Sequence, residues 1–346
     1  MSRSQFSRLK RILTGPVGAI LLIVVLMSLA MAIAGVSPID GFRALLAGAL
    51  GGRNEIGETL VATTALLFPA LGICLAFRAG LFNIGAEGQL LIGALCAGAL
   101  GAVLTLPGPV GIVLLLLAGA IGGGAWGAIA GWMKARFGAN EIITTLMLNF
   151  VAAYFALELV SGPLRGPLAA GAETAWLDPK YWLPALLPGT RLSIALLLAI
   201  ALAVFLQWVL ARTVFGYDLR ASGEAPEAAR RGGIDINRLT WLALTLSGAL
   251  AGVGGATIVT GELHRFNTQL SPGYGFTAIA VALVGDLQPL WICLAAFGFG
   301  ILESGGLAMQ ASAQVPKDAI HVIEGLIIFV LAARRYVATR VEGGPV

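Results

Sequence analysis

Long apolar stretches without a charged residue constrain the fold of this chain more than any other feature of its sequence. A helix needs about 20 apolar residues to cross a bilayer, and stretches of this kind recur along the chain. Only 12% of the residues are charged, whereas a soluble domain carries about 25%. The stretches are continuous and do not alternate between apolar and polar residues, which excludes a β-barrel. The sequence therefore predicts an all-α membrane protein.

The number and length of these stretches predict about ten transmembrane helices in a single domain, residues 1–346. One stretch, residues 88–133, is 46 residues long, enough for two crossings, and Pro107-Gly108-Pro109 supplies the turn between them. Glycine-rich stretches at residues 119–127 and 248–252 are expected to let helices pack closely. The other predicted spans cover residues 12–39, 59–77, 142–157, 192–211, 239–261, 266–285, 287–302 and 320–333.

The basic residues indicate how these spans are oriented. If the spans alternate, 15 of the 22 Lys and Arg residues fall on one side of the membrane, and the positive-inside rule assigns that side to the cytoplasm. We therefore expect a multi-pass protein of the bacterial inner membrane with both termini in the cytoplasm. The longest segment on the other side, residues 161–191, carries Trp176, Tyr181 and Trp182, which predicts an aromatic belt at the membrane surface.

Two segments interrupt the apolar pattern where membrane helices should begin. The first, residues 79–89, contains three glycines and several polar groups, and the second, residues 265–276, contains Ser271-Pro272-Gly273. Irregular backbone at membrane depth has to be lined by protein or by water. The two segments occupy the same place in the first and last five helices, but with opposite orientation. This pattern favours two inverted five-helix halves and marks a transport path with broken or re-entrant segments.

The side chains near these breaks and on the span 142–157 predict what the path carries. Amides, hydroxyls and aromatic rings suit a neutral polar solute, and the sequence holds no acidic cluster for a metal ion or basic cluster for an anion. Glu87 could instead accept hydrogen bonds from backbone N–H groups freed at the break, and Asn149 could instead join membrane helices. The predicted path residues are Phe82, Asn83, Glu87, Gln89, Thr144, Asn149, Phe276 and Thr277.

Residues 212–238 form the only long connection on the predicted cytoplasmic side, and their sequence is punctuated like a short helix. Pro226 fits the first helical position, and Gly232 can end the helix in the left-handed conformation. Between them lie an acidic residue, two alanines and two basic residues, in the order that the helix dipole favours. A helix of about six residues with one slim side fits a groove on another protein. Resting on lipid headgroups would need a large apolar face, which this segment lacks.

Several motifs of the chain resemble one family of membrane transporters. Residues 217–234 and 246–252 resemble the coupling loop of ATP-binding-cassette (ABC) importer permeases of the branched-chain amino acid and ribose class. Residues 77–89 and 138–149 are similar to motifs of the simple-sugar and nucleoside branch within that class. The resemblance covers about residues 60–333.

The resemblance implies partners for the chain. The loop would seat on a separate ATPase subunit, and the sequence agrees, because it contains no phosphate-binding motif of the form G-x-x-x-x-G-K-[ST]. The other implied partners are an extracytoplasmic solute-binding protein, a second permease subunit that is homologous or identical, and membrane lipid. No nucleic acid is expected, because the basic residues lie in short clusters between apolar stretches. The ATPase-coupling residues are Arg220, Gly223, Glu224, Pro226, Glu227, Ala228, Ala229, Arg230 and Gly232.

Together these features predict the permease subunit of an ABC importer that conducts a nucleoside or a simple sugar. Such a subunit is not an enzyme and needs no cofactor, since its partner binds the ATP. The alternative is an ion-coupled secondary transporter, which also contains inverted repeats and broken helices. Uptake that stops when ATP is depleted distinguishes the ABC importer from the secondary transporter.

Overall fold

The computed structural model describes most of the chain between residues 37 and 313. The predicted spans at residues 12–39 and 320–333 lie mostly outside the described residues, so the structure does not test them. The described residues are 37–167 and 169–313, together with 24, 25, 27–29, 31, 32, 35 and 325.

The chain divides into two compact units. Unit 1 contains residues 1–59 and 301–346, and unit 2 contains residues 60–300. Among the described residues the β-structure is limited to two isolated bridges, so the all-α prediction is confirmed for this part of the chain. Both predicted breaks and the predicted coupling loop lie in unit 2.

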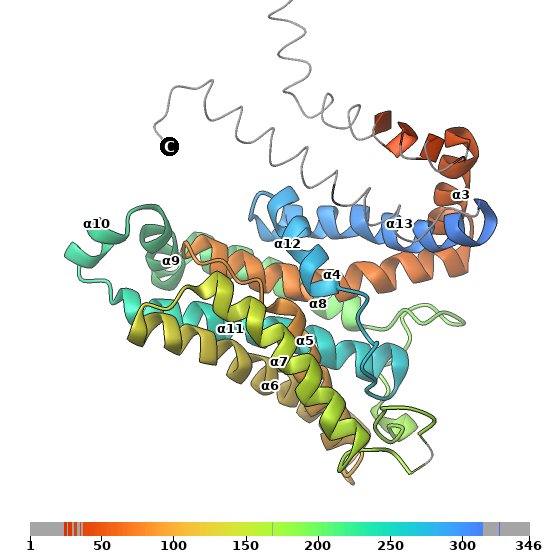
Figure 1. Cartoon of the computed structure of the whole chain (residues 1–346), viewed down its shortest axis with the longest axis horizontal. Helices are drawn as coiled ribbons and strands as arrows, with labels where there is room; N and C mark the ends of the chain where they lie inside the picture. The colour runs from red at the N-terminus through yellow and green to blue at the C-terminus, as the bar shows by residue number, and fades with distance from the viewer. Residues whose placement is uncertain are drawn as a thin grey trace, which may run out of the picture. The chain divides into compact units, whose positions relative to one another are not determined.

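Helices make up most of the described chain, and Figure 1 shows their order. They are α3 (Pro38–Leu50), α4 (Arg53–Arg78), α5 (Ala86–Gly101), α6 (Gly108–Phe137), α7 (Glu141–Ser161), η1 (Pro179–Tyr181), α8 (Ala195–Arg212), α9 (Val214–Glu224), α10 (Pro226–Arg231), α11 (Ile236–Ile258), the π-helix η2 (Val259–Leu263), α12 (Tyr274–Val284) and α13 (Pro289–Ala313). Six are long and apolar enough to cross a membrane: α4, α6, α7, α8, α11 continued by η2, and α13.

Two shorter apolar helices, α5 and α12, follow the two predicted breaks. The long stretch 88–133 is divided between α5 and α6 near Pro107, as predicted. The span predicted at residues 266–285 is wrong in length, because α12 has only 11 residues. At 1.5 Å per residue it covers about 16 Å, roughly half of a hydrocarbon core of about 30 Å. Of the eight crossings predicted for this part of the chain, six correspond to described helices that are long and apolar enough to cross a membrane, and two correspond to the shorter helices α5 and α12.

The late start of α12 has a local cause. Gly273, which precedes the helix, adopts a left-handed conformation with a φ of 108°, which glycine tolerates because it has no Cβ. The hydroxyl of Ser271 accepts hydrogen bonds from the N–H groups of Gly273 and Tyr274, at 3.2 and 2.9 Å. These contacts hold the turn at Gly273, and the helix therefore begins at Tyr274.

Unit 1 contains the helix α3 where the sequence predicts a connection between two spans. The buried residues of α3 are Gly41, Leu45 and Ala49, and their four-residue spacing places them on one helix face. Gly48 of α3 lies against Ala308 of α13 without room for a Cβ. The prediction of a plain connection missed this helix because its apolar stripe is short.

The core of unit 2 is a close contact between α6 and α11. Gly119, Gly123 and Gly127 of α6 face Gly248 and Gly252 of α11, and a Cβ on any of the five would overlap backbone atoms of the facing helix. Membrane helices gain little from burying apolar surface, so small residues that allow close backbone approach stabilise their association. The packing role predicted for these glycines is confirmed.

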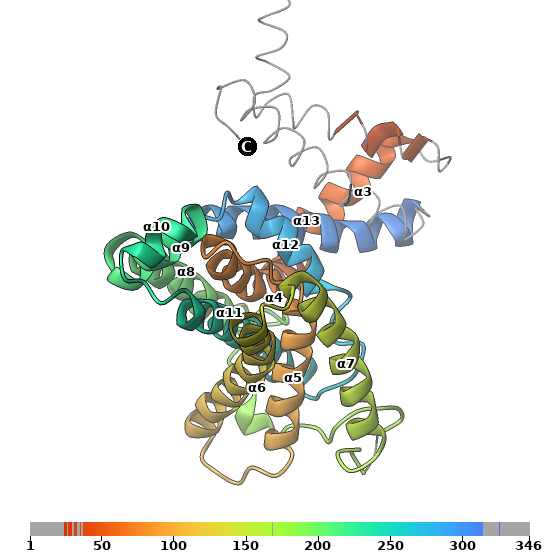
Figure 2. The ribbon, with the colours of Figure 1, turned by 60° about the vertical axis from the view of Figure 1, so that its left-hand side comes forward.

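The connections of unit 2 gather at two ends, visible in Figures 1 and 2. The α9 end comprises Arg78, helices α9 and α10, and the turn at residues 285–288. The loop end comprises residues 102–107, 162–194 and 264–267. Within unit 2, Arg78 and residues 212–238, predicted to be cytoplasmic, lie at the α9 end, and residues 162–191, predicted to be on the other side, lie at the loop end. Which side of the membrane each end faces stays a prediction.

The loop end differs from its prediction at one aromatic residue. Tyr181 is fully buried, and its hydroxyl lies 3.0 and 2.9 Å from the carbonyl oxygens of Leu104 and Leu106. Trp176 and Trp182 remain exposed. The aromatic belt is therefore wrong for Tyr181, which ties the loop to the α5–α6 connection because its polar tip finds partners there.

Candidate functional site

The first break, residues 79–85, is organised around the fully buried side chain of Asn83. Its Nδ2 donates to Oε1 of Gln89 and to Oγ of Ser247, both at 2.8 Å. Its Oδ1 accepts from the N–H of Gly85 at 3.0 Å. Because Gln89 lies on α5 and Ser247 on α11, this amide holds the break against both helices. A buried amide without partners would destabilise the protein by about 1–3 kcal/mol.

Helix α7 holds the same break from another direction. Oδ1 of Asn149 accepts from the N–H of Gly88 at 2.8 Å, and its Nδ2 donates to the carbonyl oxygen of Ile84 at 2.9 Å. Oγ1 of Thr145 accepts from the N–H of Ile84 at 3.2 Å. These N–H and C=O groups lie at the start of α5, where a helix leaves backbone groups without internal partners. Both ends of the Asn149 amide are thus engaged by the break.

Glu87 brings the two breaks together. Its Oε2 accepts a hydrogen bond of 2.7 Å from the N–H of Gly275, the second residue of α12 and 188 positions away in the sequence. A carboxylate at a helix N-terminus is stabilised by the helix dipole and by the unpaired N–H groups there. Glu87 therefore accepts from a backbone N–H freed at a break, as one interpretation of the sequence holds, but the N–H belongs to the second break.

The other predicted path residues have more exposed side chains. Phe82 and Phe276 are 52% and 44% exposed, while Thr144 and Thr277 are half-buried. The hydroxyl of Thr144 donates to the carbonyl oxygen of Asn140 at 2.9 Å. Among the predicted path residues, three are buried, three are half-buried and two are exposed: in this order, Asn83, Gln89 and Asn149; Glu87, Thr144 and Thr277; and Phe82 and Phe276.

Arg78 is a residue of the family-like motif 77–89 that the sequence assigns to neither the path nor the coupling set. Its Nε and Nη2 donate to the carbonyl oxygen of Leu287 at 3.0 and 2.9 Å, and Sγ of Cys74 lies 3.1 Å from the same oxygen. Asp286 and Leu287 have positive φ values of 50° and 54°, which are uncommon for residues with a Cβ. No local signal predicts this contact, because it joins residues 209 positions apart.

The loop 212–238 contains more helix than the sequence predicts. The predicted short helix is confirmed as α10, with six residues and Pro226 at its first position. Residues 214–224, which precede it, form the additional helix α9. The left-handed end predicted at Gly232 is wrong: its φ is −75°, and the left-handed residue is Gly233, with a φ of 89°.

Hydrogen bonds explain why the left-handed residue is Gly233 and not Gly232. The N–H of Gly232 donates to the carbonyl oxygen of Ala228 at 2.9 Å and continues the helical pattern. The N–H of Ile234 donates to the carbonyl oxygen of Ala229 at 3.1 Å, which closes the helix in the manner of a glycine-terminated motif. The turn therefore needs its left-handed residue at Gly233.

Most predicted coupling residues are presented on the surface of α10 and its approach. α10 projects from the α9 end (Figures 1 and 2). Ala229 is buried under the helix, and Arg220 donates to the carbonyl oxygen of Leu210, which fixes α9 on α8. Gly223 and Gly232 differ in exposure, the first being half-buried and the second exposed. The exposed members are Glu224, Pro226, Glu227, Ala228, Arg230 and Gly232.

Gly223 connects α9 to the first break. A Cβ on Gly223 would overlap the carbonyl oxygen of Arg78. Gly80, which has a φ of 73°, could not carry a Cβ either without approaching Cα of Gly223 to 3.1 Å. The backbones of the loop and of the break are thus in direct contact, with no side chain between them.

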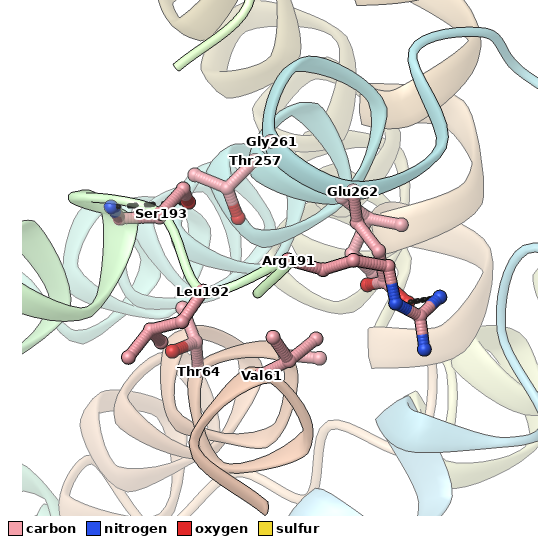
Figure 3. A pocket seen from close by; sticks show the side chains of 11 residues that line it. Val61, Thr64, Arg191, Leu192, Ser193, Thr257, Gly261 and Glu262 are labelled. Atoms are coloured by element: carbon pink, nitrogen blue, oxygen red, sulfur yellow. Dashed lines mark hydrogen bonds and ion pairs between the residues drawn. The ribbon is translucent and has the colours of Figure 1, made fainter. Parts of the chain in front are cut away.

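A small, open pocket lies at the loop end, between α4, the start of α8 and the end of α11 (Figure 3). Nη1 of Arg191 and Oε1 of Glu262 form an ion pair of 3.4 Å in its wall, and Thr64 and Thr257 contribute hydroxyl groups. None of these residues is among those predicted from the sequence. The only available signal was a charged residue at the edge of each of two spans.

A family described as "Branched-chain amino acid transport system / permease component" matches residues 55–332 of the chain. No solved structure matches the chain. Among the described residues, no group of three or more His, Cys, Asp or Glu side chains could hold a metal ion.

Several curated proteins are similar over most of their length. The Glucose ABC transporter permease protein TsgB13 of Haloferax volcanii is 32% identical over 93% of this chain and 87% of its own length. The Guanosine ABC transporter permease protein NupP of Bacillus subtilis is 32% identical over 92% of both chains. The Nucleoside ABC transporter permease protein NupB of Lactococcus lactis is 31% identical over 87% of this chain and 85% of its own.

Proposed function

The chain belongs to the family of branched-chain amino acid transport system permease components, and we propose that it conducts a nucleoside or a simple sugar through an ABC importer driven by a separate ATPase. As a member of this family it is an integral membrane transport component and not an enzyme. The proposed solute class rests on relatives named for glucose, guanosine and nucleosides and on a predicted path rich in neutral polar groups.

The observation that carries the proposal is the contact of Gly223 with Arg78. An exposed six-residue helix, α10, is joined through α9 to the backbone of a broken membrane helix. A surface with Glu227 and Arg230 exposed on a slim helix suits a groove on a partner protein, and its attachment lets that partner act on the path. We assign coupling to the residues predicted from the sequence, with Arg220 and Ala229 supporting the helices and the exposed residues contacting the ATPase.

The proposed path runs along the two breaks. Phe82 and Phe276 would offer aromatic faces, and Thr144 and Thr277 would offer hydroxyl groups to a neutral solute. Asn83, Glu87, Gln89 and Asn149 would shape the wall by holding the irregular backbone in place. This division follows from their contacts, since the second group spends its hydrogen bonds on the protein itself.

The proposed partners occupy different ends of unit 2. The α9 end would face the cytoplasm with both termini and carry the ATPase. The loop end would face a solute-binding protein, and the pocket beside Arg191 and Glu262 would lie on that side. A second permease subunit, homologous or identical, and membrane lipid would complete the surroundings.

Reconstitution tests the proposal. The chain is placed in proteoliposomes with its ATPase and solute-binding protein, and uptake of labelled guanosine and glucose is measured with and without ATP. We expect ATP-dependent uptake that persists after ion gradients are collapsed. Uptake in the absence of the ATPase that follows an ion gradient would instead establish the secondary transporter.

Charge reversal tests the coupling role of α10. The double variant Glu227→Lys/Arg230→Glu is expected to abolish uptake while the protein still inserts and folds. The matched control is Glu227→Asp/Arg230→Lys, which keeps both charges on α10 and should keep uptake. Normal uptake by the α10 variant would contradict the docking proposal.

A further inference from the structure

We infer that Arg78 is a positioning residue for transport, which carries a displacement of α9 and α10 to both broken helices. The inference rests on the proposed function, because it needs a partner that moves these two helices. It is carried by one juxtaposition: Arg78 contacts α9 through its backbone and the α12–α13 turn through its side chain.

A displacement of α10 reaches Arg78 through the backbone contact between Gly223 and Arg78. The carbonyl oxygen of Arg78 fills the place where a side chain on Gly223 would lie. A contact between two backbones has no rotatable side chain that could absorb a small movement. Since Gly223 lies near the C-terminal end of α9, directly before α10, a displacement of α10 reaches Arg78 over a few residues.

The side chain of Arg78 passes this displacement to the turn between α12 and α13. Two N–H groups of the Arg78 guanidinium converge on the carbonyl oxygen of Leu287, and hydrogen bonds from a charged donor are stronger than neutral ones. The turn that they hold contains two consecutive left-handed residues, Asp286 and Leu287. Such a conformation persists only where its surroundings impose it. Backbone hydrogen bonds within the turn also hold it, so weakening the Arg78 contact removes one of the restraints on a strained conformation.

Helix α12 carries this change to the second break. Its 11 residues form a rod of about 16 Å, with the turn at one end and Gly275 at the other. Gly275 donates to Glu87, and a Cβ on Gly275 would overlap the backbone nitrogen of Glu87. A rod fixed so closely at both ends transmits movement of the turn to the start of α5.

The displacement of Arg78 also reaches the first break directly. Residues 79–85 follow Arg78 directly in the chain, and Asn83 fixes them to α5 and α11. One residue thus joins the ATPase-facing helices to the irregular backbone on both sides of the proposed path. A residue that only stabilised the fold would not be expected to change how much solute moves for each ATP hydrolysed.

The test measures solute uptake and ATP hydrolysis on the same proteoliposomes, with the complete transporter and the variant Arg78→Gln. We expect the solute moved per ATP to fall about tenfold, within the range by which single residues modulate coupling, while the ATPase still co-purifies. Arg78→Lys keeps the charge without the planar pair of donors and is expected to give an intermediate ratio. Arg136→Gln, which removes an exposed charge at the end of α6, is the matched control.

Two further variants keep the test decisive if Arg78→Gln does not fold. Gly223→Ala places a methyl group against the Arg78 carbonyl and should lower the same ratio without removing the arginine. Adding Leu287→Gly to Arg78→Lys should restore part of the ratio, because glycine adopts a positive φ without the restraint.

The outcomes are distinct. An unchanged amount of solute per ATP in Arg78→Gln and Gly223→Ala overturns the inference, and so does a proportional loss of uptake and hydrolysis in both variants. Absence of ATP-dependent uptake in the unmodified transporter would instead overturn the proposed function, before any variant is compared.

Discussion

The α9 end and the loop end of unit 2 are built from different kinds of contact. At the α9 end, glycines let backbones touch, as at Gly80 and Gly223, and a guanidinium clamps a left-handed turn. At the loop end, backbones also touch at Gly108 and Gly166, but three ion pairs among the described residues join side chains there, and a small open pocket lies beside one of them. Backbone contacts leave little freedom to adjust, whereas partly exposed ion pairs are weak and rearrange readily. The α9 end is therefore suited to transmit a displacement, and the loop end is suited to adapt to a partner.

The largest expected difference comes from adding one methyl group to a glycine at the second break, which α12 connects to the α9 end, and to a glycine at the loop end. Gly275→Ala at the start of α12 would press its Cβ onto the backbone nitrogen of Glu87, and overpacking of this kind costs about 1–3 kcal/mol. Gly171 in the loop has open space around it, so Gly171→Ala should change stability by less than about 0.5 kcal/mol. Thermal unfolding in detergent and ATP-dependent uptake compare the two. Equal effects would show that the break is as tolerant as the loop.

The next effect comes from removing a polar group on each side of the comparison. Asn83→Ala leaves the partners on Gln89 and Ser247 buried without hydrogen bonds, at an expected loss of about 2 kcal/mol. Thr190→Ala removes a hydroxyl that donates to Leu187 at 2.8 Å in the half-exposed loop, with an expected loss below about 1 kcal/mol. Unfolding midpoints measure both. A milder loss for Asn83→Ala would mean that water replaces the amide in the break.

A smaller effect is expected from the ion pairs. Glu141 pairs with Lys134 at 2.7 Å and has a side chain only 11% exposed, and Glu141→Gln should cost about 1 kcal/mol at the start of α7. Glu262→Gln weakens a pair of 3.4 Å whose arginine is 54% exposed, and should cost less than about 0.5 kcal/mol. Repeating the unfolding in high salt should reduce the second difference more than the first. A larger loss for Glu262→Gln would argue that the loop end is the more rigid one.

The smallest effect is the pH dependence of the loop end. Burial lowers the pKa of His264 below its usual value of 6.5, and its ring stacks on Trp182 with 3.8 Å between centroids. The folded protein therefore favours neutral His264, so this stabilising contribution is present above pH 6.5 and is lost as the pH falls below it. Unfolding between pH 7.5 and 5 should show the loss, and tryptophan fluorescence should report the stack.

His264→Asn provides the control for that measurement. Asparagine tolerates the positive φ of 55° at this position but does not titrate. The pH-dependent part of the difference between the two proteins should vanish in the variant. A slope that survives the substitution would assign the effect to another group.

Much of the local structure could be predicted because its causes are local. Charge-free stretches fixed where helices lie, since a membrane helix has to satisfy its backbone within itself. Pro107 predicted the division between α5 and α6, and Pro226 predicted the start of α10. The interruption at residues 79–85 followed from glycine and polar residues at the start of an apolar stretch.

Small local errors arose where neighbouring contacts decide between similar choices. The left-handed residue after α10 is Gly233 and not Gly232, because hydrogen bonds to Ala228 and Ala229 select its position. Tyr181 turned inward because two carbonyl groups on a distant connection were available to it. Neither partner is visible in the residues that surround these positions in the sequence.

By itself the sequence determined that the chain is an α-helical membrane protein with two interrupted helices and a short helix in its longest predicted cytoplasmic connection. Only the tertiary structure decided that the two interruptions meet at Glu87 and Gly275, that Asn83 and Asn149 hold the first of them, and that Arg78 joins it to α9 and to the turn before α13. The physical reason is separation along the chain: periodicity, helix breaks and charge act over a few residues, whereas these contacts join positions that only folding brings together.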